Sequence, residues 1–354
     1  MKILLLSRYE ALGSSSRVRF YEYIPFLETK GINIQVAPFL TDDYIRRLYA
    51  GKQLNIFSIV SAYLKRIFLL LRSRTFDLLW VEKEILPWLP AWGEYLISTR
   101  LPYIVDYDDA VFHRYELHRI SAIRKVLGKK IDRVMQYSTL VLAGNDYLAS
   151  RARQAGANWV EILPSAVNVE RYPIKKTRAG LNIGWIGSPA TASFLNLIQP
   201  TLEKLVKYSD VRLTLVGANK IEFLNKDKIK NLSWSETTEI ADLQTFDVGI
   251  MPLHDGPFER GKCGYKLIQY MASGLPVVAS PIGVNRKIVE HDINGYLAST
   301  ESEWFDALYK LKTNMEKRQQ MGLAGRKKVE TDYNIHITSP RLLDFFQRVV
   351  EQNS

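Results

Sequence analysis

Short apolar runs alternate with longer segments of helical periodicity along the whole chain. The runs are rich in β-branched and aromatic side chains, which favours buried strands, and the segments between them favour helices. Strands are expected at 3–6, 34–37, 78–81, 103–105, 140–143, 161–163, 181–186, 212–216, 232–234, 248–251, 277–279 and 295–297. This alternation predicts an α/β protein whose parallel sheets are built from βαβ units.

The two halves of the chain carry the same pattern, and 354 residues are enough for two cores. A proline-bearing, polar stretch at 164–180 interrupts the rhythm and is the expected linker. We therefore expect two Rossmann-like, doubly wound domains that face each other across a cleft. A final amphipathic segment at 340–351 is expected to pack as a helix.

The amino-acid composition indicates a globular protein and excludes several other classes. Hydrophobic residues make up 47% and charged residues 24%, which is typical of a globular protein and excludes a disordered chain. A single cysteine, Cys263, excludes both an intramolecular disulfide and a cysteine-rich zinc site. The longest apolar run after the first strand, 67–71, is too short to span a bilayer. We expect a cytoplasmic protein, at most bound to the inner face of the membrane.

The charge balance points to an anionic partner. There are 48 Lys and Arg against 37 Asp and Glu, a net charge of +11. One basic cluster, 46–74, interleaves cations with Leu54, Ile56, Phe57, Ile59, Val60, Leu64, Ile67 and Phe68. This pattern predicts peripheral contact with an anionic membrane. Core helices with solvated outer faces are the alternative. A second cluster lies at 114–133, and no nucleic-acid recognition motif accompanies either one.

The first expected strand leads into a small-residue loop, followed by a helical pattern that begins near Arg17. The loop consists of Gly13, Ser14, Ser15, Ser16 and Arg17. Backbone amides at such a junction can bind phosphate or hydroxyl groups. The loop contains neither a G-x-G-x-x-G motif nor a P-loop, and a plain connection without a ligand is the alternative.

Three carboxylates, Asp106, Asp108 and Asp109, follow an apolar strand at the sheet edge where ligands bind. They repel one another, which favours a functional site over a purely stabilising role. Asp106 and Asp108 project to the same side of a strand and could hold a metal ion. The structural alternative is a helix N-cap formed by Asp108 or Asp109.

The stretch 252–294 carries the richest pattern. A polar loop with Glu259 precedes a short helix expected at 265–272. If the helix is entered at Lys262, then Lys262, Lys266 and Gln269 share one face. Two ammonium groups over a helix N-terminus suit a diphosphate, and a solvated basic face is the alternative. His254 is the one histidine with a candidate functional role.

These residues carry a resemblance to a known family. The run 270–278, followed by Ser280, Gly283, Asn294 and Gly295, resembles the donor-binding segment of retaining GT-B glycosyltransferases, family 4. The segments 164–168 and 184–188 resemble the interdomain crossing and the first strand and loop of the second domain in that family. The resemblance implies GT-B architecture, with an N-terminal domain at 1–168, completed by a C-terminal helix at 340–354, and a C-terminal domain at 169–339.

The resemblance also implies a function. A sugar would move from a nucleotide diphosphate sugar to a glycan or lipid-linked acceptor, with retention at the anomeric carbon and without a metal ion, in cell-surface polysaccharide or glycoconjugate synthesis. The nucleotide sugar would be a co-substrate, with no further cofactor and no nucleic-acid partner. The C-terminal domain would bind this donor, and the N-terminal domain would bind the acceptor.

The site residues expected on this basis fall into two groups. The catalytic residues are Asp108, Glu259 and Lys266. The donor-binding residues are Gly13, Ser14, Ser15, Ser16, Arg17, Gly187, Ser188, Lys262, Gly264, Tyr265 and Gln269. No metal ligand is expected.

The chain departs from the family pattern at several positions. Gly261 and Gln269 stand where the family has a pair of glutamates, so Glu259 is expected to take part of the first one's role. Ser188 replaces the usual loop arginine, and Asp108 replaces a histidine. These departures leave two alternatives open. One is a non-catalytic nucleotide-sugar or partner-binding protein, and the other is a metal-dependent transferase of the GT-A type that uses Asp106 and Asp108. A nucleic-acid binder is a third alternative, based only on the basic clusters.

Overall fold

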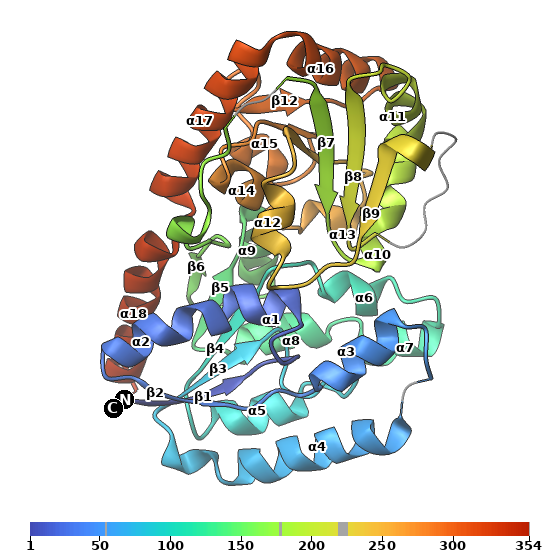
Figure 1. Cartoon of the computed structure of the whole chain (residues 1–354). Coiled ribbons are helices and arrows are strands. Elements are labelled where there is room, and N and C mark those ends of the chain that lie inside the picture. The colour runs from blue at the N-terminus through green and yellow to red at the C-terminus, as the bar shows by residue number, and fades with distance from the viewer. Residues whose placement is uncertain (54, 177–178, 219–225, 354) are drawn as a thin grey trace. The chain divides into compact units, whose positions relative to one another are not determined.

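The computed structural model describes residues 1–53, 55–176, 179–218 and 226–353. Leu54, one apolar residue of the basic cluster, and residues 177–178 of the expected linker lie outside this description. The chain divides into two compact units (Figure 1). The first unit comprises Met1–Ser165, Arg260–Cys263 and His336–Ser354, and the second comprises Ala166–Glu259 and Gly264–Ile335. The first stretch of the first unit therefore ends at Ser165, three residues before the expected boundary, and Arg260–Cys263, which we placed in the C-terminal domain, group with this unit.

The first unit is built on a parallel six-stranded sheet in the order β2-β1-β3-β4-β5-β6. Its strands are β1 (Lys2–Leu6), β2 (Asn33–Val36), β3 (Leu78–Glu82), β4 (Tyr103–Tyr107), β5 (Leu140–Ala143) and β6 (Val160–Ile162). Its helices are α1 (Ser14–Arg19), α2 (Ile24–Thr29), α3 (Asp42–Tyr49), α4 (Ile56–Leu71), α5 (Trp92–Ser98), α6 (Phe112–Glu116), α7 (Ser121–Leu127), α8 (Lys130–Tyr137), α9 (Asp146–Gln154) and α18 (Ile335–Glu351). Short 3₁₀ turns lie at Tyr21–Tyr23 and Ser73–Thr75.

The second unit is built on another parallel six-stranded sheet, in the order β12-β11-β10-β7-β8-β9. Its strands are β7 (Leu181–Ile186), β8 (Val211–Val216), β9 (Ile229–Leu232), β10 (Val248–Met251), β11 (Val277–Ala279) and β12 (Gly295–Leu297). Its helices are α10 (Pro189–Ala192), α11 (Gln199–Leu205), α12 (Glu239–Leu243), α13 (Pro257–Arg260), α14 (Tyr265–Ala272), α15 (Asn285–Ile288), α16 (Glu301–Thr313) and α17 (Met315–Asp332). Further 3₁₀ turns lie at Val169–Arg171, Ser193–Ile198 and Lys226–Lys228.

Both faces of each sheet are covered, as the continuous apolar strands require. In the first unit, side chains from α8 and α9 pack on one face of the sheet. On the other face lies the buried Trp80 ring. Its centroid is 4.7 Å from that of Phe20, which follows α1, and 5.1 Å from that of Phe346 in α18. In the second unit, α11 and α16 contribute to one core cluster and α14 and α17 to another. The predicted α/β class and its two Rossmann-like sheets are confirmed.

The structure corrects several expected boundaries. The strand expected at 232–234 is β9, at Ile229–Leu232. The final helix begins at Ile335 and runs through Pro340, so it is longer than the pattern at 340–351 indicated. The helix expected to begin near Arg17 begins at Ser14. None of the helices within the described residues is long and apolar enough to cross a membrane.

Candidate functional site

The sheet order of the second unit fixes where a ligand would bind. Numbered from β7, the order β12-β11-β10-β7-β8-β9 is that of a Rossmann sheet, and the strand order reverses between β7 and β10. Ligands of such sheets bind outside the carboxyl ends of the strands at this point. β7 ends at Ile186 and β10 at Met251, so the loops that begin at Gly187 and Pro252 border the candidate donor site.

Lys266 lies beside the loop that follows β7. Its ammonium nitrogen is 3.3 Å from the hydroxyl of Thr191 and 4.2 Å from the ring centroid of Trp185, which is buried. A Cβ at Gly187 would lie only 2.4 Å from this nitrogen and 2.6 Å from the Trp185 ring. Glycine at 187 therefore leaves the space in which the ammonium group lies. The structure brings together two expected site residues, Lys266 and Gly187.

Ser188 immediately precedes α10, and its carbonyl accepts a hydrogen bond of 2.9 Å from the backbone of Thr191. This helix has only four residues. The short hydroxyl of Ser188 lies 3.5 Å from that of Thr191. The loop after β7 is thus closed by local hydrogen bonds at Ser188, the residue that stands in place of the family's arginine.

The entry to α14 corrects the expected lysine face. The helix begins at Tyr265, and Gly264 precedes it in the left-handed region, with φ +67°. A Cβ at Gly264 would meet Ile288 at 2.4 Å, so the position needs glycine for both space and backbone conformation. Lys262 therefore lies before the helix and does not share a face with Lys266. Its carbonyl accepts a hydrogen bond of 3.1 Å from Asn145 of the first unit, the unit to which Arg260–Cys263 belong.

Gln269 does lie on α14 but is buried rather than open on a polar face. Its amide donates hydrogen bonds to Glu239 at 2.9 Å and to the hydroxyl of Tyr172 at 3.3 Å. Trp234 donates to the other oxygen of Glu239 at 2.8 Å. Sequence reasoning missed this buried carboxylate. It stands in a polar stretch, 30 residues before Gln269, and no local pattern connects the two.

Glu259 lies in α13 and is buried, and its carboxylate is 3.1 Å from the ring nitrogen Nε2 of His254. The His254 ring packs 5.2 Å from that of Phe194. A Cβ at Gly256 would come within 2.4 Å of the Glu259 carboxylate and 2.9 Å of the His254 ring. The structure thus pairs Glu259 with the one histidine that the sequence singled out, within the loop after β10.

Most of the expected loop at Gly13–Arg17 belongs to the short helix α1, which Gly13 precedes. Gly13 lies against Tyr9, where a Cβ would come within 2.4 Å of the tyrosine side chain. The Ser16 hydroxyl is buried and donates a hydrogen bond of 2.6 Å to Glu82, and Arg17 is buried as well. Ser14 is exposed and Ser15 is half-buried. The side chains of Ser16 and Arg17 therefore contribute to the packing of the first unit.

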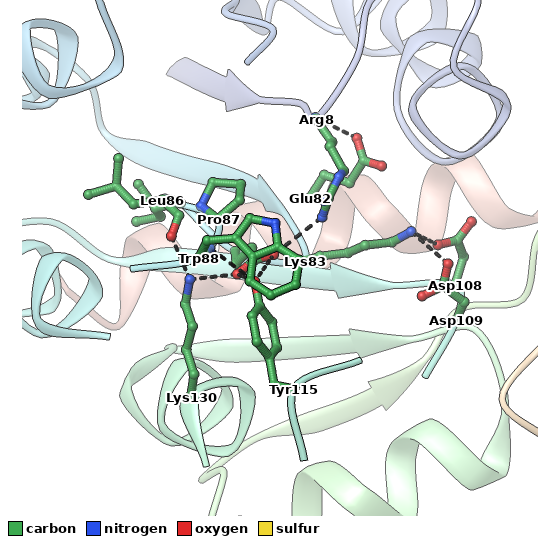
Figure 2. Close-up of polar contacts among 12 residues, drawn as sticks. Arg8, Glu82, Lys83, Leu86, Pro87, Trp88, Asp108, Asp109, Tyr115 and Lys130 are labelled. Carbon is green, nitrogen blue, oxygen red and sulfur yellow. Dashed lines mark hydrogen bonds and ion pairs between the residues drawn. The ribbon is translucent and has the colours of Figure 1, made fainter. Parts of the chain in front are cut away.

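Lys83 organises the carboxylates that follow β4. It comes directly after β3 with φ +64°, and its buried ammonium group lies 2.9 Å from both Asp108 and Asp109 (Figure 2). Burial alone would raise the pKa of Asp108, but Lys83 and a hydrogen bond from Ser15 hold that pKa below its ordinary value. Asp108 is therefore an ionised acceptor of hydrogen bonds at neutral pH. It is also the point at which two expected site residues, Ser15 and Asp108, meet.

Asp106 has a different partner from Asp108. Arg19 donates to both of its oxygens, at 2.8 and 2.9 Å, and to the carbonyl of Leu163 at 2.7 Å. Burial raises the pKa of Asp106 to about 6 although Arg19 acts in the opposite direction. Because cations already hold both Asp106 and Asp108, the pair does not fit the expected metal-binding alternative. Among the described residues, no three His, Cys, Asp or Glu side chains gather to hold a metal ion.

A second buried carboxylate network extends from the same edge. Glu84 accepts hydrogen bonds from Lys130 at 2.6 Å, Arg8 at 3.2 Å and the hydroxyl of Tyr115 at 2.8 Å. Burial opposes its charge, but Lys130 and Arg8 hold the pKa of Glu84 below its ordinary value. Sequence reasoning missed this group. The available signal was the polar triplet 82–84, which directly follows an apolar strand.

Comparisons with known proteins bear on the family and on the fold. Residues 181–314 match the family model described as glycosyl transferases group 1. A Bacillus subtilis protein, TuaH, named as a teichuronic acid biosynthesis glycosyltransferase, is 22% identical over 194 residues, which are 49% of this chain and 48% of that relative. The chain thus spans about half the length of that relative.

Solved structures share the whole fold. Sucrose-phosphate synthase from Thermosynechococcus elongatus has a TM-score of 0.75 at 14% identity and covers 99% of this chain and 100% of its own. HepE from Anabaena, in complex with UDP-glucose, has a TM-score of 0.72 at 14% identity and covers 98% of this chain and 100% of its own. The GT-B fold and the resemblance to group 1 glycosyltransferases in the second unit are confirmed.

Proposed function

We propose that this chain is a glycosyltransferase that moves a sugar from a nucleotide diphosphate sugar to a glycan or lipid-linked acceptor. Retention at the anomeric carbon and independence from a metal ion are part of the proposal and rest on the resemblance. The pairing of Asp106 and Asp108 with cations is consistent with a reaction that needs no metal at these residues. The second unit would bind the donor, and the first unit would contribute residues that bind the acceptor.

The observation that carries the proposal is the place of Lys266. Its ammonium group lies against Trp185 and Thr191 at the strand reversal of the second sheet. An ammonium group held there can stabilise the negative charge that grows on a diphosphate as the sugar bond breaks. The Trp185 ring positions this charge without neutralising it, because a cation over an aromatic face keeps its full charge. The likeness to HepE, solved in complex with UDP-glucose, agrees with a sugar-nucleotide substrate, and TuaH is named as a glycosyltransferase.

Nucleotide sugars should raise the melting temperature of the protein. A ligand at 100 times its dissociation constant stabilises the native state by about 2.7 kcal/mol. A thermal-shift panel that begins with UDP and UDP-glucose would identify the donor, and release of nucleoside diphosphate in the presence of glycans would then measure turnover. Tight binding without turnover for any donor and acceptor pair would support the non-catalytic alternative. A failure of every nucleotide sugar to bind would contradict the proposal.

Asp108 is proposed to accept a hydrogen bond from a sugar hydroxyl of a substrate. Asp108→Asn keeps the size of the side chain but removes its charge, and hydrogen bonds to charged groups contribute about 1.5–3 kcal/mol. Turnover should therefore fall by roughly 10- to 150-fold. The melting temperature should change little, because Lys83 keeps Asp109 at 2.9 Å.

Asp109→Asn is the matched control for Asp108→Asn. It removes the other carboxylate of the same lysine, so it should alter stability to a similar degree. Steady-state turnover and thermal unfolding of both variants separate the two roles. Full activity in Asp108→Asn, or unfolding of that variant alone, would remove Asp108 from the proposed site.

A further inference from the structure

Helix α4 presents an apolar face to solvent. Phe57 is 86% exposed, Leu64 63% and Leu71 70%, and Ile56, Val60, Ile67 and Phe68 are also exposed. These residues recur every three or four positions, so they form one continuous stripe along the helix. Single exposed apolar residues are common on proteins, whereas a contiguous stripe marks an interaction surface.

The opposite side of α4 is fixed to the first unit. Tyr63, Leu69 and Leu70 pack against the core, and the Tyr63 hydroxyl donates a hydrogen bond to the carbonyl of Pro87. The buried Arg66 guanidinium donates to the carbonyls of Ser7 and Ala37, both at 3.0 Å. The helix is therefore attached to the first unit by its inner side. Its outer stripe does not belong to the core of this unit.

The segment that contains the stripe carries charges of one sign. Segment 46–74 contains no acidic residue, and its cations are Arg46, Arg47, Lys52, Lys65, Arg66, Arg72 and Arg74. All of them except Arg66 are exposed. The Arg72 guanidinium lies 4.2 Å from the ring centroid of the exposed Phe68, so a cation borders the apolar stripe directly.

Three further aromatic residues of the first unit, in segment 88–95, are exposed. Trp88 follows Pro87, the residue that accepts the Tyr63 hydrogen bond, and is 41% exposed. Trp92 and Tyr95 of α5 are each about half exposed. In Figure 1, α4 and α5 lie on the same side of the first unit. Trp and Tyr favour the boundary between the apolar and polar layers of a bilayer.

We propose that this face of the first unit docks on the surface of an anionic lipid bilayer, with the α4 stripe inserted among the lipids and the flanking cations over the headgroups. A basic amphipathic helix with Phe and Leu on its apolar face has the composition of an interfacial helix. Cations near an anionic leaflet also contribute to binding, and this electrostatic attraction adds to the hydrophobic contribution of the inserted stripe. Two copies of the chain joined through this face would bring their cations together, which opposes self-association.

The proposal predicts selective binding to anionic vesicles. The full chain should co-sediment with vesicles of phosphatidylcholine and phosphatidylglycerol far more than with phosphatidylcholine alone, and salt should weaken the difference. The variant Phe57→Ser/Leu64→Ser/Phe68→Ser should bind the anionic vesicles at least about tenfold more weakly. Lys65→Glu/Arg72→Glu should reduce the preference for anionic over neutral vesicles.

The matched control places the same substitution on exposed apolar residues elsewhere, as Ile293→Ser/Leu323→Ser/Ile337→Ser. This variant should bind vesicles like the unchanged protein. Equal binding of the α4 variant and the unchanged protein, or equal binding to neutral and anionic vesicles at low salt, would overturn the proposal. So would a dimer that the α4 substitutions convert to a monomer without any vesicle binding, because a second copy would then cover the stripe.

The inference goes beyond the proposed function and does not rest on it. The α4 substitutions lie in the first unit, and the proposed donor residues Lys266 and Gly187 lie in the second. UDP titration of the α4 variant should therefore give the affinity of the unchanged protein. Vesicle binding without binding of any nucleotide sugar of the thermal-shift panel would contradict the proposed function alone, and nucleotide-sugar binding without vesicle binding would contradict the docking surface alone.

Discussion

Replacing Lys266 by alanine should weaken UDP binding by roughly 10- to 150-fold, because a hydrogen bond to a charged group contributes about 1.5–3 kcal/mol. The ammonium group lies at the strand reversal of the second sheet, 3.3 Å from the Thr191 hydroxyl. Ser188 has no side-chain cation to share the diphosphate charge. Calorimetric titration of UDP against the purified protein and the variant measures the difference directly.

Two other lysines serve as comparisons, Lys262 before α14 and Lys204 of α11 in the second unit. Lys262 precedes α14 and does not share its face, so Lys262→Ala should weaken UDP binding less than Lys266→Ala. Lys204 forms an exposed ion pair with Glu301 at 2.5 Å, so Lys204→Ala should leave UDP affinity unchanged. Equal UDP affinity in the unchanged protein and in Lys266→Ala would exclude Lys266 from the donor site.

The architecture could be predicted because the relevant information is local. Continuous apolar runs such as 78–81 and 248–251 lie in strands buried on both faces, and the periodicity between them is that of the covering helices. Glycines also carried local information. Gly187 and Gly264 are glycine because a Cβ would collide with Lys266 and Ile288, and both were singled out from the sequence.

The site itself depends on pairs that no local pattern connects. Arg19 meets Asp106 across 87 positions, and Gln269 meets Glu239 across 30. Lys83 was missed because a lysine after a strand is ordinarily a solvated residue, whereas here it is buried between two carboxylates. The helix expected at 265–272 is α14, but its entry at Lys262 was wrong because Gly264, in the left-handed region, precedes the first helical residue. Such facts are consequences of the tertiary fold.

Arg19→Met should destabilise the protein by about 3–5 kcal/mol, because it leaves the buried Asp106 carboxylate without its cation. Arg19 also bonds the carbonyl of Leu163, so the substitution releases the segment after β6 as well. The matched control is Arg151→Met. Arg151 pairs with Asp132 and Glu116 near the surface, where an ion pair contributes about 0–1 kcal/mol. Urea denaturation followed by circular dichroism compares the two variants.

The pH dependence of the Arg19→Met defect tests its physical cause. The native pKa of Asp106 is raised by burial to about 6 even with Arg19 present, against about 3.9 for an unfolded aspartate. Removing Arg19 takes away a contribution that lowers this pKa, so the native variant holds its proton to higher pH. The native state then binds more protons than the unfolded state, and stability falls as pH rises. The loss of stability should therefore be larger at pH 8 than at pH 5, where the neutral carboxyl tolerates burial.

The double variant Arg19→Met/Asp106→Leu removes both charges. It should recover much of the lost stability and lose the pH dependence. A defect of equal size at both pH values, or no recovery in the double variant, would show that Arg19 stabilises the unit through packing and the Leu163 carbonyl rather than through the charge of Asp106.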